Sequence, residues 1–281
     1  MKIGDYHLHT FETGRFALDG GAMFGVVPKK LWEKSIPADA DNRIPLALRT
    51  LLLRSDKRTI LIDTGIGDKF DEKYMQIYDI TPPEVSIPEK LAGLGISRYD
   101  VTDIILTHLH FDHTGGTTFL AGGELKMTYP NAIHHLQEAH WKWSNSPAEK
   151  DRASFINENF SMIKTEGKLN LLTGECELYP GIDILVMHGH TPAMQLVKVS
   201  DGQNTLLYCA DLIPTGAHVP VPWVMAYDNN PLITISEKKQ LLPRAAEEQW
   251  ILFFEHDPFR EAATIINTEK GFKIDSDVVI G

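Results

Sequence analysis

The densest group of chemically useful side chains in this 281-residue sequence is the stretch THLHFDHTGG at positions 107–116. It follows the apolar run VTDIIL and places His108, His110, Asp112 and His113 within six residues. Alternate side chains of an extended backbone lie on one face, so His108 and His110 can bind one cation. Asp112 and His113 lie where the chain must turn, and a turn can direct them to a second cation. The spacing therefore predicts two adjacent metal ions.

The types of ligand limit the metals that such a site would bind. Imidazole suits zinc, iron and similar first-row ions, and a carboxylate beside it suits a site that also holds water. We expect two divalent ions, zinc first, with iron, manganese and cobalt as alternatives because they accept the same donors. The sequence has only two cysteines, Cys176 and Cys209, which excludes an all-cysteine metal site and a disulfide scaffold.

The elements that must position these residues are visible as apolar runs. Eight extended runs predict strands at residues 46–53, 59–62, 101–106, 126–129, 182–187, 196–199, 205–209 and 250–254. Helices are expected at 136–143, 147–164 and 236–248, the last capped by Thr234 or Ser236. Strands alternate with helices, which favours a layered α/β or α+β architecture. Because residues 1–281 contain no legible linker or repeat, we expect a single domain.

Composition and charge exclude several classes of protein. With 43% hydrophobic and 23% charged residues the chain is not intrinsically disordered. No run approaches the roughly 18 consecutive apolar residues of a membrane helix. The first ten residues, MKIGDYHLHT, lack the apolar core of a secretory signal, so we expect a cytoplasmic protein that does not bind membranes. A net charge of −11 disfavours nucleic acid as a partner.

The motif H-x-H-x-D-H, followed by glycines and preceded by a hydrophobic strand, resembles the signature of the metallo-β-lactamase-fold hydrolases. Four further motifs follow that family's order: LIDTGIG at 61–67, HGHTP at 188–192, CAD at 209–211 and FEHDP at 254–258. The resemblance implies the four-layer αββα sandwich of that fold. It also implies that a hydroxide bridging two metal ions is the nucleophile, so that no serine or cysteine nucleophile is needed.

The resemblance also implies a set of ligands. His108, His110 and His190 would bind the first metal ion. Asp112, His113 and His256 would bind the second, and Asp211 would bridge both. Asp112 is in addition the candidate catalytic residue, because its second oxygen can orient the hydroxide and carry a proton to the leaving group. Asp63 is expected to orient a ligand or the 107–116 loop without binding metal itself.

Some of these histidines and aspartates have structural alternatives. His188 is the rival of His190, and Asp63 and Asp211 equally suit residues that only form a turn. Three further histidines, at positions 134, 135 and 140, are expected to be surface or packing residues near a strand-to-helix junction. The stretch DYHLHT at 5–10 resembles the opening of the polymerase-and-histidinol-phosphatase family. The further motifs of that family do not follow, so we expect His7 and His9 in an amino-terminal strand.

The identity of individual residues narrows the branch of the family. His110 stands where diiron flavoproteins have glutamate, and Asp211 stands where zinc β-lactamases place cysteine. Only 25 residues follow His256, too few for the glutathione-binding extension of glyoxalase II. The chain is therefore most similar to lactonases and methyl-parathion-hydrolase-like esterases. We expect hydrolysis of esters, foremost lactones such as acyl-homoserine lactones. The alternatives are a phosphotriester or aryl ester hydrolase, a glyoxalase II-like thioesterase, and an idle metal-binding sensory or recognition module.

The substrate contacts follow from the same resemblance. The irregular segments 17–41 and 214–231 are candidate pocket walls, with Trp223 as a contact in the second. In the lactonase branch the segment matching 18–34 lines the pocket and supports a dimer. That match implies a homodimer and makes Met23, Phe24 and Val26 candidate acyl-chain contacts, although all three also suit a core. Many acyl-homoserine lactonases have a tyrosine shortly after the bridging aspartate, and this sequence has DLIPTGAH there. The candidate substitutes are Tyr227 and His218.

Overall fold

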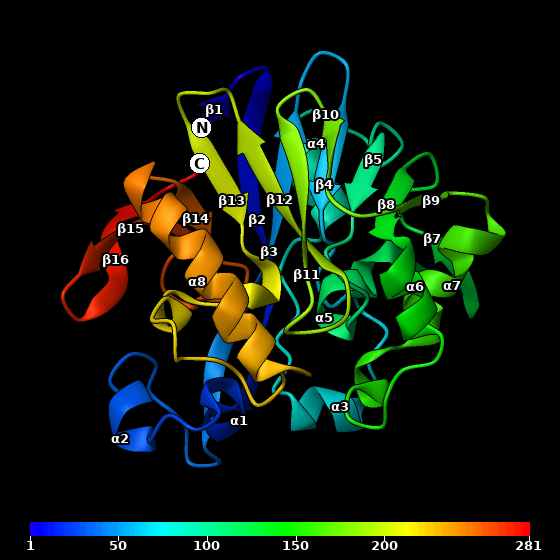
Figure 1. Cartoon of the computed structure of the whole chain (residues 1–281). Coiled ribbons are helices and arrows are strands. Elements are labelled where there is room, and N and C mark those ends of the chain that lie inside the picture. Colours follow the sequence, from blue (N-terminus) through cyan, green and yellow to red (C-terminus); the bar gives the residue numbers. More distant parts are fainter. The chain divides into compact units, whose positions relative to one another are not determined.

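The computed structural model describes residues 1–281 (Figure 1). These residues form two compact units. Unit 1 comprises residues 1–15, 48–174 and 281, and unit 2 comprises residues 16–47 and 175–280. Two of the boundaries between the units fall inside long strands, β2 (Tyr6–Asp19) and β3 (Arg43–Arg54). The single domain expected over the whole chain stays a prediction.

Unit 1 is built on a seven-stranded sheet with the order β1-β2-β3-β4-β5-β8-β9. Besides β2 and β3, its strands are β1 (Lys2–Ile3), β4 (Thr59–Ile62), β5 (Asp103–Ile105), β8 (Ile133–Gln137) and β9 (Leu169–Leu172). The strands from β4 to β9 pair in parallel. Parallel strands are covered on both faces, which explains why β4 and β5 are almost continuously apolar and buried. The carboxyl end of β5 leads directly into the histidine motif.

Five helices belong to unit 1 (Figure 1): α3 (Glu72–Ile77), α4 (Ile87–Gly93), α5 (Phe111–Thr114), α6 (Glu138–Ser144) and α7 (Asn157–Thr165). A separate hairpin consists of β6 (Thr118–Ala121) and β7 (Glu124–Met127). Ser86 and Glu89 form a capping box that starts α4. Leu91 of α4, Trp141 of α6 and Phe160 of α7 join the buried cluster on the sheet. These helices therefore cover the sheet from which the motif emerges.

Unit 2 contains a second seven-stranded sheet, whose strands follow sequence order from β10 to β16. They are β10 (Cys176–Tyr179), β11 (Ile182–Met187), β12 (Met194–Ser200), β13 (Thr205–Tyr208), β14 (Ile251–Phe253), β15 (Ala262–Thr268) and β16 (Gly271–Val278). Only β13 and β14 pair in parallel. A parallel pair needs a crossover, and the long helix α8 (Pro231–Glu247) provides it.

Most of the predicted elements are confirmed. The strands at 59–62 and 182–187 have the predicted bounds. The helix predicted from residue 147 is wrong at its start, because Arg152–Ser154 forms a 3-10 turn and α7 begins only at Asn157. Helix α8 begins earlier than predicted, with Asn230 at its N-cap and Pro231 at the first helical position. That position favours proline, whose missing N–H would have no partner there anyway.

The segment 17–41 is less irregular than expected. It contains two short helices, α1 (Gly20–Phe24) and α2 (Lys29–Trp32). Asp19 starts α1 by accepting a hydrogen bond from the amide of Ala22 at 2.7 Å. Helices and sheets occur in both units, so the mixed α/β class predicted from the sequence is confirmed. None of the helices has the length and apolarity that crossing a membrane requires.

Candidate metal centre

The histidine motif of unit 1 leaves β5 and turns into α5, which brings its four predicted ligands together. Nε2 of His108 lies 3.0 Å from Nδ1 of His110. The rings of His108 and His113 have centroids 4.0 Å apart, and Nε2 of His113 lies 3.7 Å from Oδ2 of Asp112. All four side chains are buried. The turn thus concentrates three imidazoles and one carboxylate in a small volume.

Asp63, which follows β4, holds this turn through both carboxylate oxygens. Oδ1 accepts from the amide of Thr107 at 2.8 Å, and Oδ2 accepts from the Thr107 hydroxyl at 2.7 Å. Oδ2 also lies 3.1 Å from Nδ1 of His113. A proton on Nδ1 then directs Nε2 of the same ring toward Asp112. This is the arrangement in which a carboxylate fixes the orientation and tautomer of a metal-binding histidine.

Glycines allow the two motifs of unit 1 to pack backbone against backbone. A Cβ atom on Gly115 would lie 1.7 Å from the carbonyl oxygen of Ile66, and one on Gly116 would lie 2.2 Å from that of Thr64. The amide and hydroxyl of Thr64 donate to the carbonyl of His113 at 2.8 and 3.1 Å. Lys69 donates to the carbonyl of Gly115. The LIDTGIG segment is therefore the support on which the ligand-bearing turn rests.

In unit 2 the three predicted ligands gather around one carboxylate. Oδ2 of Asp211 lies 3.1 Å from Nε2 of His190, and Oδ1 of Asp211 lies 3.2 Å from Nε2 of His256. All three side chains are buried. Each oxygen of Asp211 thus faces a different imidazole. A carboxylate presented in this way has one oxygen available for each of two cations.

Both histidine ligands of unit 2 are held by partners distant in sequence. Oδ1 of Asp228 lies 3.0 Å from Nδ1 of His190, and the carbonyl of Ala47 lies 2.9 Å from Nδ1 of His256. Asp228 was missed in the sequence, where it belongs to no motif and lies within a segment noted only as a candidate wall. Asp211 follows Ala210, whose φ of 42° places the turn in the left-handed region.

His188, the rival of His190, has a different role. Its side chain is exposed, and Nδ1 accepts from the amide of Ala193 at 3.2 Å. Its own amide and that of Gly189 donate to the carboxylate of Glu237. The geometry therefore favours His190, and not His188, as the ligand of the HGHTP turn.

The donor atoms in both units suit a divalent metal. Nitrogen and oxygen ligands at about 2.0–2.1 Å from one tetrahedral zinc ion lie about 3.3 Å from each other. The imidazole-to-carboxylate distances are 3.1 and 3.2 Å in unit 2 and 3.7 Å in unit 1. Since the donor types are those that zinc and similar ions prefer, the residues present fit the metal that the motifs imply.

Aromatic side chains surround the motif of unit 1. Phe111, which lies between two predicted ligands, has its ring centroid 5.5 Å from that of Phe70 and 5.2 Å from that of Tyr78. Tyr74 stacks on Tyr78 at 6.3 Å. Burial, and to a lesser extent the negative charge of Asp112, raises the pKa of Tyr78. The sequence signal for this aromatic group is Phe111 inside the motif.

The predicted substrate contacts of unit 2 lie mainly in one packed group. The ring of Phe24 stacks on His218 at 4.6 Å and lies 5.7 Å from Trp223. Nε2 of His218 donates to the carbonyl of Met23, and Nδ1 of the neutral ring accepts from the hydroxyl of Thr215, each at 2.8 Å. Burial lowers the pKa of His218 to about 4, so this ring is neutral at neutral pH.

The remaining candidates are more accessible. Trp223 is half-buried, Tyr227 is 38% exposed and Val26 is 93% exposed. The substrate roles of all of these residues in unit 2 stay predictions.

The other histidines pack inside unit 1 as expected. Burial lowers the pKa of His134 to about 3, and neither ring nitrogen of this residue has a hydrogen-bond partner. His135 lies 2.8 Å from Asp103. His140 accepts from the amide of Leu109 at 2.9 Å and so supports the ligand-bearing turn from α6. His7 and His9 lie in β2, the predicted amino-terminal strand.

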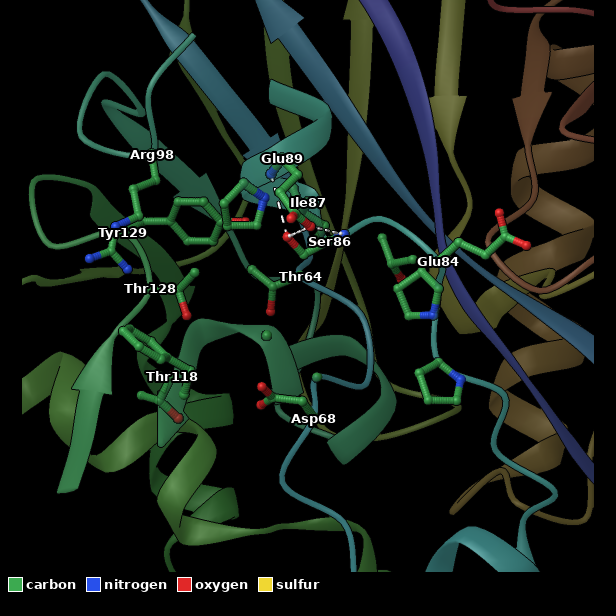
Figure 2. Close-up of a pocket in the computed structure, with 17 residues that line it drawn as sticks. Thr64, Asp68, Glu84, Ser86, Ile87, Glu89, Arg98, Thr118, Thr128 and Tyr129 are labelled. Atoms are coloured by element: carbon green, nitrogen blue, oxygen red, sulfur yellow. Dashed lines mark hydrogen bonds between the residues drawn. The ribbon is translucent and has the colours of Figure 1, made fainter. Parts of the chain in front are cut away.

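A cavity of about 380 Å³ lies within unit 1, beside the glycines of its two motifs (Figure 2). Gly67 and Gly116 form part of its wall, together with Thr64, which bonds to the ligand-bearing turn. Tyr129 also lines the cavity, and its buried hydroxyl has no hydrogen-bond partner. None of the predicted metal ligands lines this cavity. The predicted ligands therefore do not form this cavity.

The chain belongs to the metallo-β-lactamase superfamily, whose family model matches residues 46–256. The matched region includes four of the five motifs of the resemblance in full and the fifth as far as His256. The metallo-β-lactamase type of fold predicted from the sequence is thereby confirmed, as is a metal-dependent hydrolase as the class of protein.

Known relatives support the lactonase-like branch. An N-acyl homoserine lactonase from Bacillus cereus is 25% identical over 245 residues, which cover 83% of this chain and 87% of that protein. A crystal structure described as a probable metal-dependent hydrolase from Staphylococcus aureus has a TM-score of 0.89 at 31% identity and covers 99% of this chain and 100% of its own. A dizinc quorum-quenching lactonase with a bound product has a TM-score of 0.82 at 22% identity, covering 100% and 97% of the two chains.

Proposed function

We propose that this protein is a dinuclear metal hydrolase that opens lactones, with acyl-homoserine lactones as its substrate class. The main observation behind this proposal is the position of Asp211. One of its carboxylate oxygens lies 3.1 Å from His190 and the other lies 3.2 Å from His256. Relatives that match most of the chain include an N-acyl homoserine lactonase. Membership of the family supports the hydrolysis of esters as the reaction. The preference for lactones among esters is the more specific part of the proposal.

The proposed ligands are the seven residues that the motifs indicate, with two divalent ions, zinc first. His108, His110 and His190 would hold one ion, Asp112, His113 and His256 would hold the other, and Asp211 would be shared by both. This assignment is supported by the order of the motifs in the family and by the contacts within each unit. Zinc is proposed because imidazole and carboxylate suit it and because one structural relative is a dizinc lactonase.

Two metal ions, when bound, supply positive charge that acidifies a water and polarises the ester carbonyl. The chain's own residues orient and transfer protons. We assign Asp112 to orienting the attacking water and to carrying a proton to the leaving alcohol. Asp63 and Asp228 keep the proton of His113 and of His190 on Nδ1, so that Nε2 of each ring is the ligand atom.

The aromatic group of unit 1, which consists of Phe70, Tyr74, Tyr78 and Phe111, favours the proposal of an acyl substrate. Phe111 lies between two predicted ligands in the sequence, and its ring packs against those of Phe70 and Tyr78. Such a wall suits a hydrocarbon chain better than a charged group. For the substrate carbonyl we propose Tyr227, because the other candidate, His218, uses both ring nitrogens within its own unit. We propose Met23, Phe24 and Trp223 as residues that shape the pocket and do not contact the reacting atoms.

We also propose that the chain forms a homodimer through the segment 18–34. The support is that Val26 is 93% exposed and Leu31 is 51% exposed, both in this short segment. Light scattering should then give twice the mass of one chain at micromolar concentration. A monomer under these conditions contradicts the dimer and leaves the hydrolase proposal unchanged.

A metal analysis combined with a substrate panel tests the proposed function. The purified protein should contain about two equivalents of metal and should cleave acyl-homoserine lactones faster than thioesters, aryl esters or phosphotriesters. Activity on thioesters alone contradicts the lactone assignment and keeps the metal centre. A protein that holds two metal ions but hydrolyses no ester supports the idle metal-binding module instead.

A further inference from the structure

A fully buried lysine, Lys238 of α8, has no place in the chemistry proposed above. Its side chain is 0% exposed. Its ammonium donates to three carbonyls of one segment: that of His218 at 2.6 Å, Pro220 at 2.8 Å and Trp223 at 2.9 Å. A lysine ammonium has three N–H donors, so all of them are used. These three acceptors offset the loss of water around the buried charge.

The segment that Lys238 holds, residues 214–230, leads to a ligand. At its end, Asp228 lies 3.0 Å from Nδ1 of His190. The amides of Asn229 and Asn230 donate to the carbonyls of His190 and Gly189, at 2.9 and 2.8 Å. The segment therefore closes directly on the HGHTP turn, and it has little regular structure of its own besides one 3-10 turn at Gly216–His218.

Glu237, the residue before Lys238 on α8, binds the HGHTP turn, which is the other partner in this contact. The carboxylate of Glu237 accepts from the amides of His188 and Gly189. Gly189 also packs on the first turn of the helix, since a Cβ there would lie 2.3 Å from the Thr234 hydroxyl oxygen. Two consecutive residues of one rigid helix thus fix the two segments that the Asp228–His190 hydrogen bond joins.

We propose that Lys238 is a positioning residue, whose ammonium orders residues 214–230 so that Asp228 holds His190 in the orientation needed for metal binding. This inference rests on the proposed function only for the role of His190 as a ligand. The contacts of Lys238 exist independently of that role, so the order of the segment is measurable in a protein of any activity.

Because Lys238 can lose its charge, its proposed role predicts a dependence on pH. A side chain that only filled space would show no such dependence. Burial lowers the pKa of Lys238 to about 7, and the negative charge of Asp228 opposes this shift. His218, the other titratable group at this position, has a pKa of about 4 and stays neutral above pH 6. When Lys238 loses its proton, the amine has two N–H donors for three carbonyls, and the segment loses one of its hydrogen bonds.

Loss of the Lys238 proton loosens the segment, but it has the opposite effect on the stability of the whole protein. Because the pKa of Lys238 is lower in the folded chain than its ordinary value of 10.5, the unfolded chain binds more protons between about pH 7 and pH 10.5. The contribution of this group to the free energy of unfolding therefore rises with pH in that range. Loosening of residues 214–230 above pH 7 without global destabilisation is the signature of the proposed role.

Hydrogen exchange on the metal-loaded protein, with Lys238→Met and the control Lys239→Met, tests the proposal. Lys239 is the exposed neighbour on the same helix. After correction for intrinsic exchange, residues 214–230 of the wild type should exchange faster above pH 7, while unit 1 does not change. Lys238→Met should exchange fast in this segment at every pH and lose about 10- to 100-fold in kcat, as expected for residues that orient a metal ligand. Lys239→Met should behave as the wild type.

Four outcomes of this experiment have distinct meanings. Equal exchange of residues 214–230 in the two variants overturns the proposal, and so does wild-type exchange that is independent of pH. If Lys238→Met does not fold, the wild-type pH series still decides, because it needs no variant. If the wild type cleaves no lactone but its segment loosens above pH 7, the proposed function fails while the role of Lys238 in ordering the segment stands.

Discussion

Unit 1 and unit 2 hold their candidate ligands by different means. In unit 1, four ligands lie within one turn at 108–113, and glycine backbones and Asp63 support that turn from a neighbouring segment. In unit 2, three ligands come from turns at positions 190, 211 and 256, and the two histidines among them each depend on a partner from elsewhere in the chain. Ligands that are adjacent in sequence can be recognised from the sequence alone. Ligands that are far apart in sequence can be assigned securely only when the residues that hold them are known.

Removing one ligand from either unit should have the largest effect. We expect His108→Ala and Asp211→Ala each to lose metal and to lower hydrolysis by more than about 100-fold, because even residues that only support ligands are worth 10- to 100-fold. Metal content and kcat/KM measure this effect. His7→Ala, which changes an exposed histidine of β2, is the control. If one of the two variants kept both metals and full activity, that unit would not contribute to the centre.

The backbone packing of unit 1 should be the next most sensitive feature. Gly115→Ala places a Cβ 1.7 Å from the Ile66 carbonyl, which only backbone movement can relieve. We expect a loss of about 3 kcal/mol in the free energy of unfolding, the upper part of the usual range for overpacking. Urea unfolding measures it. Gly93→Ala has open space around the new Cβ and should be neutral or stabilising. A Gly115→Ala protein of wild-type stability would show that the two motifs do not need this close approach.

The supporting carboxylates allow a direct comparison of the two units. We expect Asp63→Asn and Asp228→Asn to lower metal affinity by about 10- to 100-fold. The larger loss should follow Asp63→Asn, because that carboxylate has three partners and Asp228 has two. Competition with a chelator gives both affinities. Asp71→Asn, at the N-cap of α3, is the control, because asparagine caps a helix as well as aspartate does. The reverse order would mean that the dispersed ligand depends more on its partner.

Substitution of the buried neutral histidines should have the smallest effect, a change in the free energy of unfolding that depends on pH. The pKa of His134 in unit 1 is about 3 in the folded chain, against an ordinary value of 6.5. The unfolded chain takes up a proton below pH 6.5, so stability is lost as the pH falls from 6.5 toward 3. Each pH unit corresponds to about 1.4 kcal/mol, so His134→Leu should gain about 2 kcal/mol over the wild type between pH 7.5 and pH 5.

His218 gives the matching measurement in unit 2. Its pKa is about 4, so His218→Leu should also reduce the loss of stability in acid. Unlike His134, however, His218 bonds to Thr215 and to the carbonyl of Met23. His218→Leu should therefore cost stability at neutral pH, where His134→Leu costs little. Equal behaviour of the two variants in denaturation at pH 7.5 would show that the hydrogen bonds of His218 contribute no net stability.

The difference between the units also explains what the sequence predicted. Local patterns sufficed for β4, for β11 and for the ligand-bearing turn, because the apolar runs and the glycines of these segments are adjacent in sequence. Asp228 and Lys238 were missed, since their roles arise from contacts with residues 38 and 20 positions away. The start of α7 was missed because the segment before it folds into a turn that periodicity does not reveal. Long-range contacts decide such positions, and local sequence patterns do not describe them.

The ammonium of Lys238 has a consequence for the conditions in which the protein works. Clusters of inward-facing carbonyl oxygens in proteins often recruit sodium, potassium or calcium from the medium, and their order then varies with the ionic composition of the surroundings. Here the chain supplies that positive charge itself, through a tethered group that cannot diffuse away. Below pH 7, where Lys238 is protonated, the organisation of residues 214–230 should consequently be the same in dilute buffer and in concentrated salt.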